Sequence, residues 1–254
     1  MSTATLPRLE GLPAVGLEEL VATSGLLTRV DRKYVLTALE AGMLTALAPA
    51  GTRVLEIDGH RTLGYTTRYL DTDGLLTQRL AAHGRRRRFK VRSRRYDLTG
   101  AAYLEVKTRE GERTVKSRLE GVHLEHDRLD CAGAQFVIDA LAAAGIDDRT
   151  VVDLAPALDI RYDRTTLHLA GDGARVTVDR ALRWERPDGQ VLERPDLVVV
   201  ETKGPGRPSS LDRVLWSLGH RPRRMSKYAT GLAALDPALP ANRWARTLRD
   251  HVRP

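Results

Sequence analysis

Cationic side chains recur at every second residue in several short segments of this 254-residue chain. The clearest segment is 89–94, with the sequence FKVRSR. Successive side chains of an extended strand point to opposite faces, so Lys90, Arg92 and Arg94 share one face and Val91 lies on the other. Such a row of cations favours the binding of an anion that carries several charges.

Four further segments, 103–107, 114–119, 175–179 and 198–203, repeat this alternation. The residues that share a face in them are Glu105 and Lys107, Lys116 and Arg118, Arg175, Thr177 and Asp179, and Glu201 and Lys203. One such strand is typical of a solvated sheet face, whereas five indicate a sheet that curls around a strongly positive interior. The acids among these residues would offset the cost of confining the cations.

The composition is that of a folded, basic protein. Hydrophobic residues make up 42% of the chain and the formal net charge is +8, which favours polyanionic partners. Aromatic residues make up only 5%, which is low for a module that stacks nucleic-acid bases. The single cysteine, Cys131, excludes an intramolecular disulfide and a Cys-rich zinc site, and we expect it to be a small core residue on an apolar helix face.

The chain shows no sign of a membrane or secretory segment. No apolar run approaches the roughly 20 residues of a membrane span. The first residues also lack a basic stretch followed by an apolar one. We therefore expect a cytoplasmic protein.

Strands that are mainly connected by hairpins must position these charges. The predicted strands are 30–36, 53–57, 64–71, 89–94, a hairpin over 99–120 with its turn at 109–112, 157–169, 174–184 and 197–203. The predicted helices are 17–22, 38–48, 75–82, 129–144, 211–218 and a last one that begins at 226–228. Thr37 is the expected N-cap of the second helix, and Ser209 with Asp212 forms an expected capping box.

This pattern predicts an α+β fold built on a closed antiparallel β-barrel with helices packed on the outside. The helices would cover the apolar outer face of the barrel, and the charged face would line a tunnel. The sequence contains no linker and no repeat, so we predict one domain over 26–235. A leader with a short helix (1–25) would precede this domain, and a C-terminal tail (236–254) would follow it.

Nine short motifs occur along the chain in an order that is typical of one family. They are Asp31-Arg32-Lys33-Tyr34, Arg68-Tyr69-Leu70-Asp71, Lys90-Val91-Arg92, Glu105-Val106-Lys107, Lys116-Ser117-Arg118, Arg161-Tyr162-Asp163-Arg164-Thr165, Arg175-Val176-Thr177-Val178-Asp179, Glu201-Thr202-Lys203 and Arg224-Met225-Ser226-Lys227-Tyr228. In order and kind, the set resembles the VTC domain (vacuolar transporter chaperone), the polyphosphate polymerase branch of the triphosphate tunnel metalloenzymes. The resemblance spans about 28–230.

The resemblance implies a tunnel in which the γ-phosphoryl of ATP, or of another NTP, is transferred to a growing polyphosphate chain. It implies catalytic roles for Lys33, Arg164 and Glu201, with Glu201 as the ligand of Mn²⁺ or Mg²⁺. The triphosphate-binding residues that it implies are Lys33, Arg79, Lys90, Arg92, Lys107, Lys116, Arg118, Tyr162, Arg164, Arg175, Lys203, Arg224 and Lys227. Its implied partners are ATP, inorganic polyphosphate and triphosphate, with no specific nucleic acid.

The chain departs from the family pattern in two places. The arginine pair that is usual on the basic strand is Lys90 and Arg92, and the last basic pair is Arg224 and Lys227. Both substitutions keep the charge but change the donor geometry, because Arg is a planar fork and Lys a point donor. No SPX-type domain or membrane segment occurs in the sequence, so any membrane partner is expected to be a separate protein.

Two other functions remain open at this stage. A triphosphatase of the same fold would hydrolyse inorganic triphosphate or a nucleoside triphosphate, although the Glu-x-Glu-x-Lys signature of the related CYTH branch is missing from the first strand. A non-catalytic polyphosphate-binding module would bind anions without needing a metal. Simpler interpretations also exist for single motifs: a solvated turn for 85–88, exposed salt bridges for Glu105 and Glu201, and packing roles for Tyr34 and Tyr228.

Overall fold

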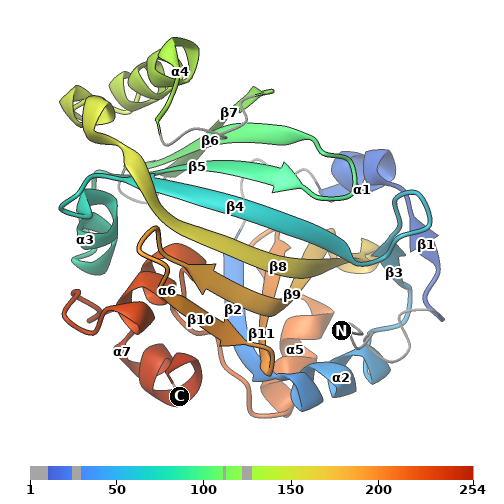
Figure 1. Cartoon of the computed structure of the whole chain (residues 1–254). Coiled ribbons are helices and arrows are strands. Elements are labelled where there is room, and N and C mark those ends of the chain that lie inside the picture. Colours follow the sequence, from blue (N-terminus) through green and yellow to red (C-terminus); the bar gives the residue numbers. More distant parts are fainter. Residues whose placement is uncertain (1–10, 25–29, 111–112, 122–127, 254) are drawn as a thin grey trace. The chain divides into compact units, whose positions relative to one another are not determined.

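The computed structural model describes residues 11–24, 30–110, 113–121 and 128–253. The described chain forms two compact units, which we treat separately. Unit 1 holds the described parts of Met1–Leu63, Tyr162–Leu182 and Arg194–Arg224, and unit 2 holds those of Gly64–Arg161, Arg183–Glu193 and Met225–Pro254. The elements are labelled in Figure 1.

Most elements agree in kind with the sequence predictions. The strands are β1 (Ala14–Val15), β2 (Val30–Thr37), β3 (Thr52–Leu55), β4 (Leu63–Asp71), β5 (Arg88–Tyr96), β6 (Ala102–Glu110), β7 (Arg113–Glu120), β8 (Ala155–Leu169), β9 (Ala174–Glu185), β10 (Val191–Arg194) and β11 (Leu197–Gly204). The helices are α1 (Leu17–Ser24), α2 (Ala38–Ala46), α3 (Leu76–Ala82), α4 (Cys131–Ala142), α5 (Ser210–Ser217), α6 (Lys227–Leu235) and α7 (Ala245–Thr247), with short η1 (Arg149–Asp153), η2 (Ala170–Asp172) and η3 (Leu248–Val252).

Local sequence signals account for several helix starts. The Thr37 side chain accepts a hydrogen bond from the Glu40 backbone N–H, which confirms the predicted cap. The Glu40 carboxylate in turn accepts one from the Thr37 backbone N–H at 2.7 Å, which completes a capping box. Ser209 and Asp212 form the predicted box at the start of α5. The sequence did not predict β1, β10, α7 or η3. Residues 1–10 of the predicted leader and 111–112 of the predicted hairpin turn lie outside the described residues.

Unit 1 is built on antiparallel strands in the order β2–β11–β9–β8, with β3 beside β8 and β1 beside β3. Alternate residues of β2, β9 and β11 form an apolar face that α2 and α5 cover. This core contains Tyr34, Leu36, Ala41, Leu44, Val176, Val178, Val198, Val200, Leu211 and Leu215. Burying each large apolar side chain contributes about 1.5–3 kcal/mol, so the apolar face fixes which side of the strands carries the charges.

Asp212 ties α5 to the strands of unit 1. Its buried carboxylate accepts hydrogen bonds from the Tyr34 hydroxyl at 2.6 Å, the Thr202 hydroxyl at 2.7 Å and the Ser209 backbone N–H at 2.7 Å. Tyr34 is therefore buried, as the packing interpretation predicted.

Unit 2 is built on antiparallel strands in the order β8–β4–β5–β6–β7. Helix α4 packs against β6 and β7 and buries Val137 and Leu141 among the apolar residues of β5 and β6. The prediction that Cys131 is a core residue is wrong: Cys131 is exposed. It is the first residue of α4, and the buried stripe of this helix runs through Gly133, Val137 and Leu141 instead.

In unit 2, Asp71 at the end of β4 has the role that Asp212 has in unit 1: its buried carboxylate joins helices to a strand. It is 1% exposed and accepts hydrogen bonds from the Thr77 backbone N–H (2.9 Å) and hydroxyl (2.7 Å) and from the Gln78 backbone N–H (3.1 Å). It also accepts one from the Tyr228 hydroxyl at 2.5 Å. A single carboxylate thus joins β4, α3 and α6, and Tyr228 is a buried packing residue as expected.

The antiparallel sheet with helices confirms the coarse fold prediction. The described strand pairings do not close the sheet, so the closed barrel stays a prediction. The division into 1–25, 26–235 and 236–254 also stays a prediction, although the last of these segments buries Trp244, Leu248 and Val252 in unit 2. None of the described helices is long and apolar enough to cross a membrane.

Replacing Asp71 should destabilise the fold. We expect Asp71→Asn to lower the free energy of unfolding by about 3 kcal/mol, because a buried charged acceptor loses part of its hydrogen bonding. Chemical denaturation followed by circular dichroism measures this loss. Asp73→Asn, at an exposed position two residues away, is the matched control and should cost less than about 0.5 kcal/mol. Equal denaturation midpoints for the two variants would contradict this role for Asp71.

Candidate functional site

The charged face of unit 1 carries two rows of facing side chains. In the first row Lys33 of β2 faces Glu201 of β11, which faces Thr177 of β9. In the second row Asp31 faces Lys203, which faces Arg175. With the neighbouring Val35, Val199 and Asp179 and with Tyr162 and Arg164 of β8, these residues form what we call the Glu201 cluster. The period-two prediction for β2, β9 and β11 is therefore confirmed.

Glu201 is held between two lysines. Its side chain is 11% exposed, the Lys33 ammonium forms an ion pair with one carboxylate oxygen, and the Lys203 ammonium lies 3.1 Å from the other. The pKa of Lys203 is lowered to about 7 in net: burial has the largest effect, the charge of Glu201 opposes it, and the charges of Arg164 and Lys33 act in the same direction as burial. Positive charge is therefore in excess around Glu201, and an anion placed here would stabilise the charged lysines.

Arg164 is fixed by a buried acid. The Nε–H of its guanidinium donates a hydrogen bond to one carboxylate oxygen of Asp179 at 2.6 Å, and the Nη2–H donates one to the other oxygen at 2.8 Å. Asp179 is fully buried. The guanidinium also lies 5.3 Å from the centre of the Tyr162 ring. This bidentate pair orients Arg164 beside Tyr162.

The side-chain hydroxyl of Thr177 is buried on the charged face of β9. The residue is 3% exposed, and its hydroxyl has no hydrogen-bond partner among the residues that the structure describes. Buried hydroxyls are normally hydrogen-bonded, and Thr177 faces Glu201 across the strands. We interpret this hydroxyl as a position that a bound ligand completes.

The charged face of unit 2 carries two comparable rows. Lys90 of β5, Lys107 of β6 and Lys116 of β7 face one another in one row. Arg92, Glu105 and Arg118 form the next row. We call these six residues the Glu105 cluster. Their opposite face is the apolar side that α4 covers, so the predicted alternation is confirmed in these strands too.

Glu105 joins three of these cations. It is 2% exposed, and its carboxylate lies 2.6 Å from the Arg92 Nη2, 2.5 Å from the Lys116 ammonium and 2.9 Å from the Arg118 Nη2. Burial alone would raise the pKa of Glu105, but the charges of Arg92, Arg94 and Lys116 outweigh it and hold the pKa well below the usual value. The ion pairs are therefore cross-strand bridges, and they also fix the positions of the three cations.

Two stacked tyrosines lie beside the Glu105 cluster. The rings of Tyr69 and Tyr228 stack with their centres 4.6 Å apart, and the Tyr69 hydroxyl accepts a hydrogen bond from Arg92 at 2.9 Å. The Lys90 ammonium donates to the Ser226 hydroxyl at 2.7 Å. Burial raises the pKa of Tyr69, but the charges of Arg92, Lys90 and Arg94 lower it to about 8 in net.

The remaining predicted residues lie outside these rows. Arg79 is exposed on α3 and donates to the Gly74 carbonyl at 2.8 Å, so its described bond is local. Arg224 is exposed, but the preceding Arg223 backbone N–H donates to the Lys33 carbonyl at 2.7 Å and holds this segment against β2. Lys227 is half-buried at the start of α6. The functional roles of all these residues stay predictions.

Sequence reasoning named the charged residues but not the neutral groups between them. Tyr69 and Thr177 occupied quoted motifs without a role, and Ser226 was noted only as the start of a helix. The sequence did contain a signal for Thr177, because this residue shares a face with Arg175 and Asp179 in a strand whose other face is apolar. The contact of Tyr69 with Tyr228 has no such signal, because the two residues are far apart in the sequence.

A metal ion would have few protein ligands. No three His, Cys, Asp or Glu side chains gather into a metal site within the described residues. Glu201 supplies one carboxylate, and the uncommitted Thr177 hydroxyl faces it. Mg²⁺ commonly binds through one or two carboxylates while substrate phosphates supply further oxygens, so these residues fit a metal that arrives with a phosphate chain.

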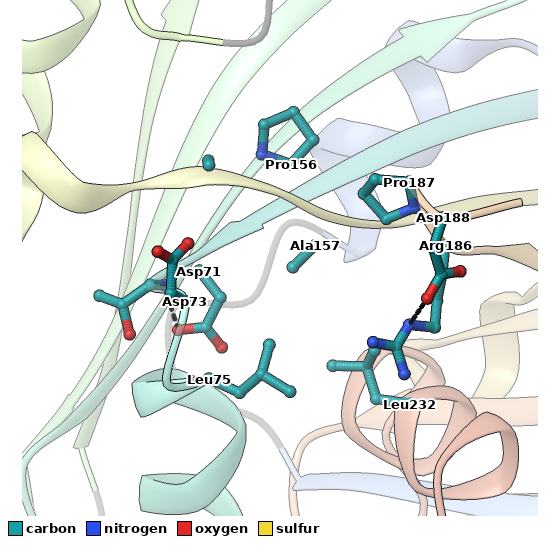
Figure 2. A pocket seen from close by; sticks show the side chains of 11 residues that line it. Asp71, Asp73, Leu75, Pro156, Ala157, Arg186, Pro187, Asp188 and Leu232 are labelled. Atoms are coloured by element: carbon teal, nitrogen blue, oxygen red, sulfur yellow. Dashed lines mark hydrogen bonds and ion pairs between the residues drawn. The ribbon is translucent and has the colours of Figure 1, made fainter. Parts of the chain in front are cut away.

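A pocket in unit 2 differs in character from both clusters. It has a volume of about 220 Å³. Figure 2 shows the Asp73 carboxylate on one side and the Arg186–Asp188 ion pair on the other, with the apolar Leu75 and Leu232 between them. No predicted site residue lines this pocket, and its acids make it unsuitable for a polyphosphate chain.

Comparisons with known proteins agree with the fold and the motif order. The sequence model of the VTC domain matches residues 28–236. A candidate adenylate cyclase of Bacillus halodurans superposes with a TM-score of 0.50 at 13% identity, over 78% of this chain and 93% of that one. Hippeastrum HpAC1, described as an adenylyl cyclase candidate with a dominant triphosphatase activity, gives a TM-score of 0.50 at 15% identity over 82% and 99%. No curated protein matches the chain. These structural likenesses show that the chain shares the fold of these two proteins.

The low pKa of Glu105 predicts an acid-sensitive contribution to stability. The unfolded chain binds a proton at Glu105 near the ordinary value of 4.5, whereas the folded protein does not. The contribution is therefore complete above that value and falls by about 1.4 kcal/mol for each pH unit below it. We expect Glu105→Gln to remove this part of the acid dependence in denaturation measured from pH 7 downward.

Glu120→Gln is the matched control, because Glu120 is an exposed residue of the same strand pair. Its stability curve should keep the acid slope of the wild type. Parallel curves for the wild type and Glu105→Gln would show that Glu105 does not carry the effect.

Proposed function

The chain belongs to the VTC domain family, and on this premise we propose that it is a metal-dependent polyphosphate polymerase. It would transfer the γ-phosphoryl of ATP, or of another NTP, to the end of a polyphosphate chain inside a closed tunnel. The observation that carries the proposal is the arrangement of cations in cross-strand rows, several of them paired with the buried carboxylates of Glu105, Glu201 and Asp179. Surface charges that only improve solubility would not need to be paired with buried carboxylates.

Phosphoryl transfer requires that the donor and acceptor phosphates are positioned in line and that their negative charges are neutralised. An oxygen of the acceptor's terminal phosphate attacks the γ-phosphorus, the bond from that phosphorus to the β–γ bridging oxygen breaks, and ADP leaves with the electron pair. Lys33, Arg164 and Lys203 would stabilise the negative charge on the transferring group. The acceptor oxygen is already ionised near neutral pH, so no strong general base is required.

Glu201 and the Thr177 hydroxyl would hold the metal together with phosphate oxygens. Bound Mn²⁺ or Mg²⁺ would supply additional charge neutralisation. Glu201 must then exchange a lysine contact for the metal, which the phosphate makes favourable by attracting the released lysine. The proposal places the reaction in the cytoplasm.

A triphosphatase is the second candidate. HpAC1, which shares the fold, is described as having a dominant triphosphatase activity. The same residues would serve if water replaced the phosphate acceptor, and the product would be free phosphate in place of a longer chain. A non-catalytic polyphosphate-binding module is the remaining alternative, since the rows of cations alone would bind the anion.

The products separate these functions. We expect the purified protein with ATP, Mn²⁺ and a short polyphosphate primer to form a metal-dependent ladder of longer chains on a gel. Glu201→Gln should lower turnover at least about 100-fold while keeping most of the affinity for triphosphate, because the lysines remain. Glu18→Gln, an exposed acid of α1, is the control and should behave as the wild type.

Each other product pattern has a defined meaning. Free phosphate without a ladder would replace the polymerase with the triphosphatase. Tight triphosphate binding without any turnover would establish the binding module. Normal turnover by Glu201→Gln would remove Glu201 from the reaction.

Thr177 gives a separate test of the metal-binding residues. Thr177→Val keeps the shape of the side chain but lacks the hydroxyl, and we expect the Mn²⁺ concentration for half-maximal activity to rise about tenfold. Thr177→Ser should restore it. Because the buried hydroxyl has no partner among the described residues, Thr177→Val should unfold without ligand at the same or a higher denaturant concentration than the wild type. A destabilised Thr177→Val would show that the hydroxyl serves the fold instead.

A further inference from the structure

Helix α2 of unit 1 (Figure 1) exposes large apolar side chains on the side opposite its own core. Ala41 and Leu44 are buried against the strands, whereas Leu39, Met43 and Leu47 are 77%, 46% and 48% exposed. The last three are spaced by four residues and therefore form one ridge along the helix, which the Leu47 N–H extends by donating to the Met43 carbonyl at 3.1 Å. A helix that is apolar on all sides is typically buried, so we expect a partner to cover this ridge.

A row of small residues runs beside the ridge. Ala38, Gly42 and Ala46 each precede a ridge residue by one position, and both alanines are exposed. A Cβ atom added at Gly42 would meet no atom of the described chain within 4 Å beyond its own helix, so the packing of these residues does not require a glycine. Glycine inside a helix is less favourable than alanine, because it loses more backbone freedom. The row is instead suited to the close approach of another surface. We call the ridge and the row together the α2 face (Ala38, Leu39, Gly42, Met43, Ala46 and Leu47).

The α2 face is almost free of charge in a strongly basic protein. Residues 38–50 contain one charged residue, Glu40, although 29% of the chain is charged and the net charge is +8. The Glu40 carboxylate is half-buried and accepts hydrogen bonds from the Thr37 backbone N–H at 2.7 Å and hydroxyl at 2.9 Å, so it belongs to the helix cap. Two copies of a basic chain repel each other, and this repulsion is smallest where both surfaces are uncharged.

The same charge pattern argues against a membrane as the partner of this face. A helix that lies on a membrane surface carries lysines and arginines beside its apolar residues, which attract anionic lipids. Residues 38–50 contain no lysine and no arginine. The α2 face therefore fits an uncharged protein surface better than a lipid surface.

The shape of the α2 face is complementary to a second copy of itself. Rows of residues spaced by four are the ridges and grooves along which helices pack, and two such sets interdigitate at a crossing angle of about −50° with the axes about 8–10 Å apart. Under a two-fold axis, the large ridge of each copy would lie in the small row of the other. A face that holds both a ridge and a small row can make this exchange without a different partner.

We propose that the α2 face is the interface of a two-fold symmetric homodimer of this chain. The contact involves one short helix from each copy and is smaller than the roughly 800 Å² per partner of a standard interface, so the dimer would be reversible. The Glu201 cluster lies on the opposite side of the same strands, so a partner on α2 would leave that cluster accessible. The inference goes beyond the proposed function and does not depend on it.

Sedimentation equilibrium over a range of protein concentrations tests the dimer. We expect the apparent mass of the wild type to rise reversibly from that of one chain toward that of two. Leu39→Gln combined with Met43→Gln should weaken the association at least about tenfold, because the ridge is lost from both copies. Val152→Gln combined with Leu98→Gln is the matched control, since these residues are 78% and 40% exposed in unit 2, and it should associate as the wild type does.

Gly42→Gln separates the interface from the fold. Glutamine is a better helix former than glycine, so the variant should unfold at the same or a higher denaturant concentration than the wild type when both are dilute. Its long side chain would occupy the row of small residues and weaken the association at least about tenfold. A Gly42→Gln variant that is stable and associates like the wild type would contradict the inference.

Three further results would overturn the homodimer. A wild type that stays monomeric up to about 0.2 mM would exclude it as a specific contact. If that monomer binds vesicles of phosphatidylcholine and phosphatidylglycerol and the Leu39→Gln, Met43→Gln variant does not, the face belongs to a membrane. A dimer that both double variants weaken equally would reflect general apolar association. None of these measurements uses turnover, so a failure of the proposed function would leave their outcome unchanged.

Discussion

The structure depends on confining like charges to one face of each antiparallel sheet. Cations at strand spacing repel one another, and partial burial strengthens the repulsion. Buried carboxylates offset it at three points: Glu105 holds three cations, Glu201 holds two lysines and Asp179 holds Arg164. Removing one partner of a buried pair typically costs about 3–5 kcal/mol, so these acids are required even before any substrate binds.

Two further acids show by contrast what a purely structural carboxylate does here. Asp71 and Asp212 accept hydrogen bonds mainly from hydroxyl and backbone N–H groups, and each joins a helix to strands. Asp71 accepts its described hydrogen bonds from neutral donors, and Asp212 adds to its neutral donors one ion pair, with the Arg32 Nη1 3.6 Å from its carboxylate. Glu105 and Glu201 instead pair mainly with cationic side chains, and a phosphate chain would compete with the two carboxylates for these cations. This difference in partners separates the acids that hold the architecture from those that organise a site.

The sequence predicted the charged faces because a strand has a fixed period of two. Lys33 with Glu201 and Arg92 with Glu105 follow from this period once the strands pair, and the caps at Thr37 and Ser209 follow from local hydrogen bonding. Contacts between distant segments have no periodic signal. The Tyr69–Tyr228 stack and the hydrogen bond from the Gln78 side chain to the Pro240 carbonyl depend on where α6 and the last residues pack, and the prediction of a C-terminal tail gave no indication of this.

The lysines of the two clusters show how the protein tolerates its charge without substrate. Burial lowers the pKa of Lys203 to about 7 and that of Lys116 to about 8, and nearby cations act in the same direction. Each lysine is therefore partly neutral near physiological pH, which reduces repulsion in the free protein. An arginine at either position would stay charged throughout. A bound phosphate chain would raise the pKa of these lysines, and they would take up protons and become fully charged. The attraction between the lysines and the phosphates would therefore increase when the phosphate chain binds.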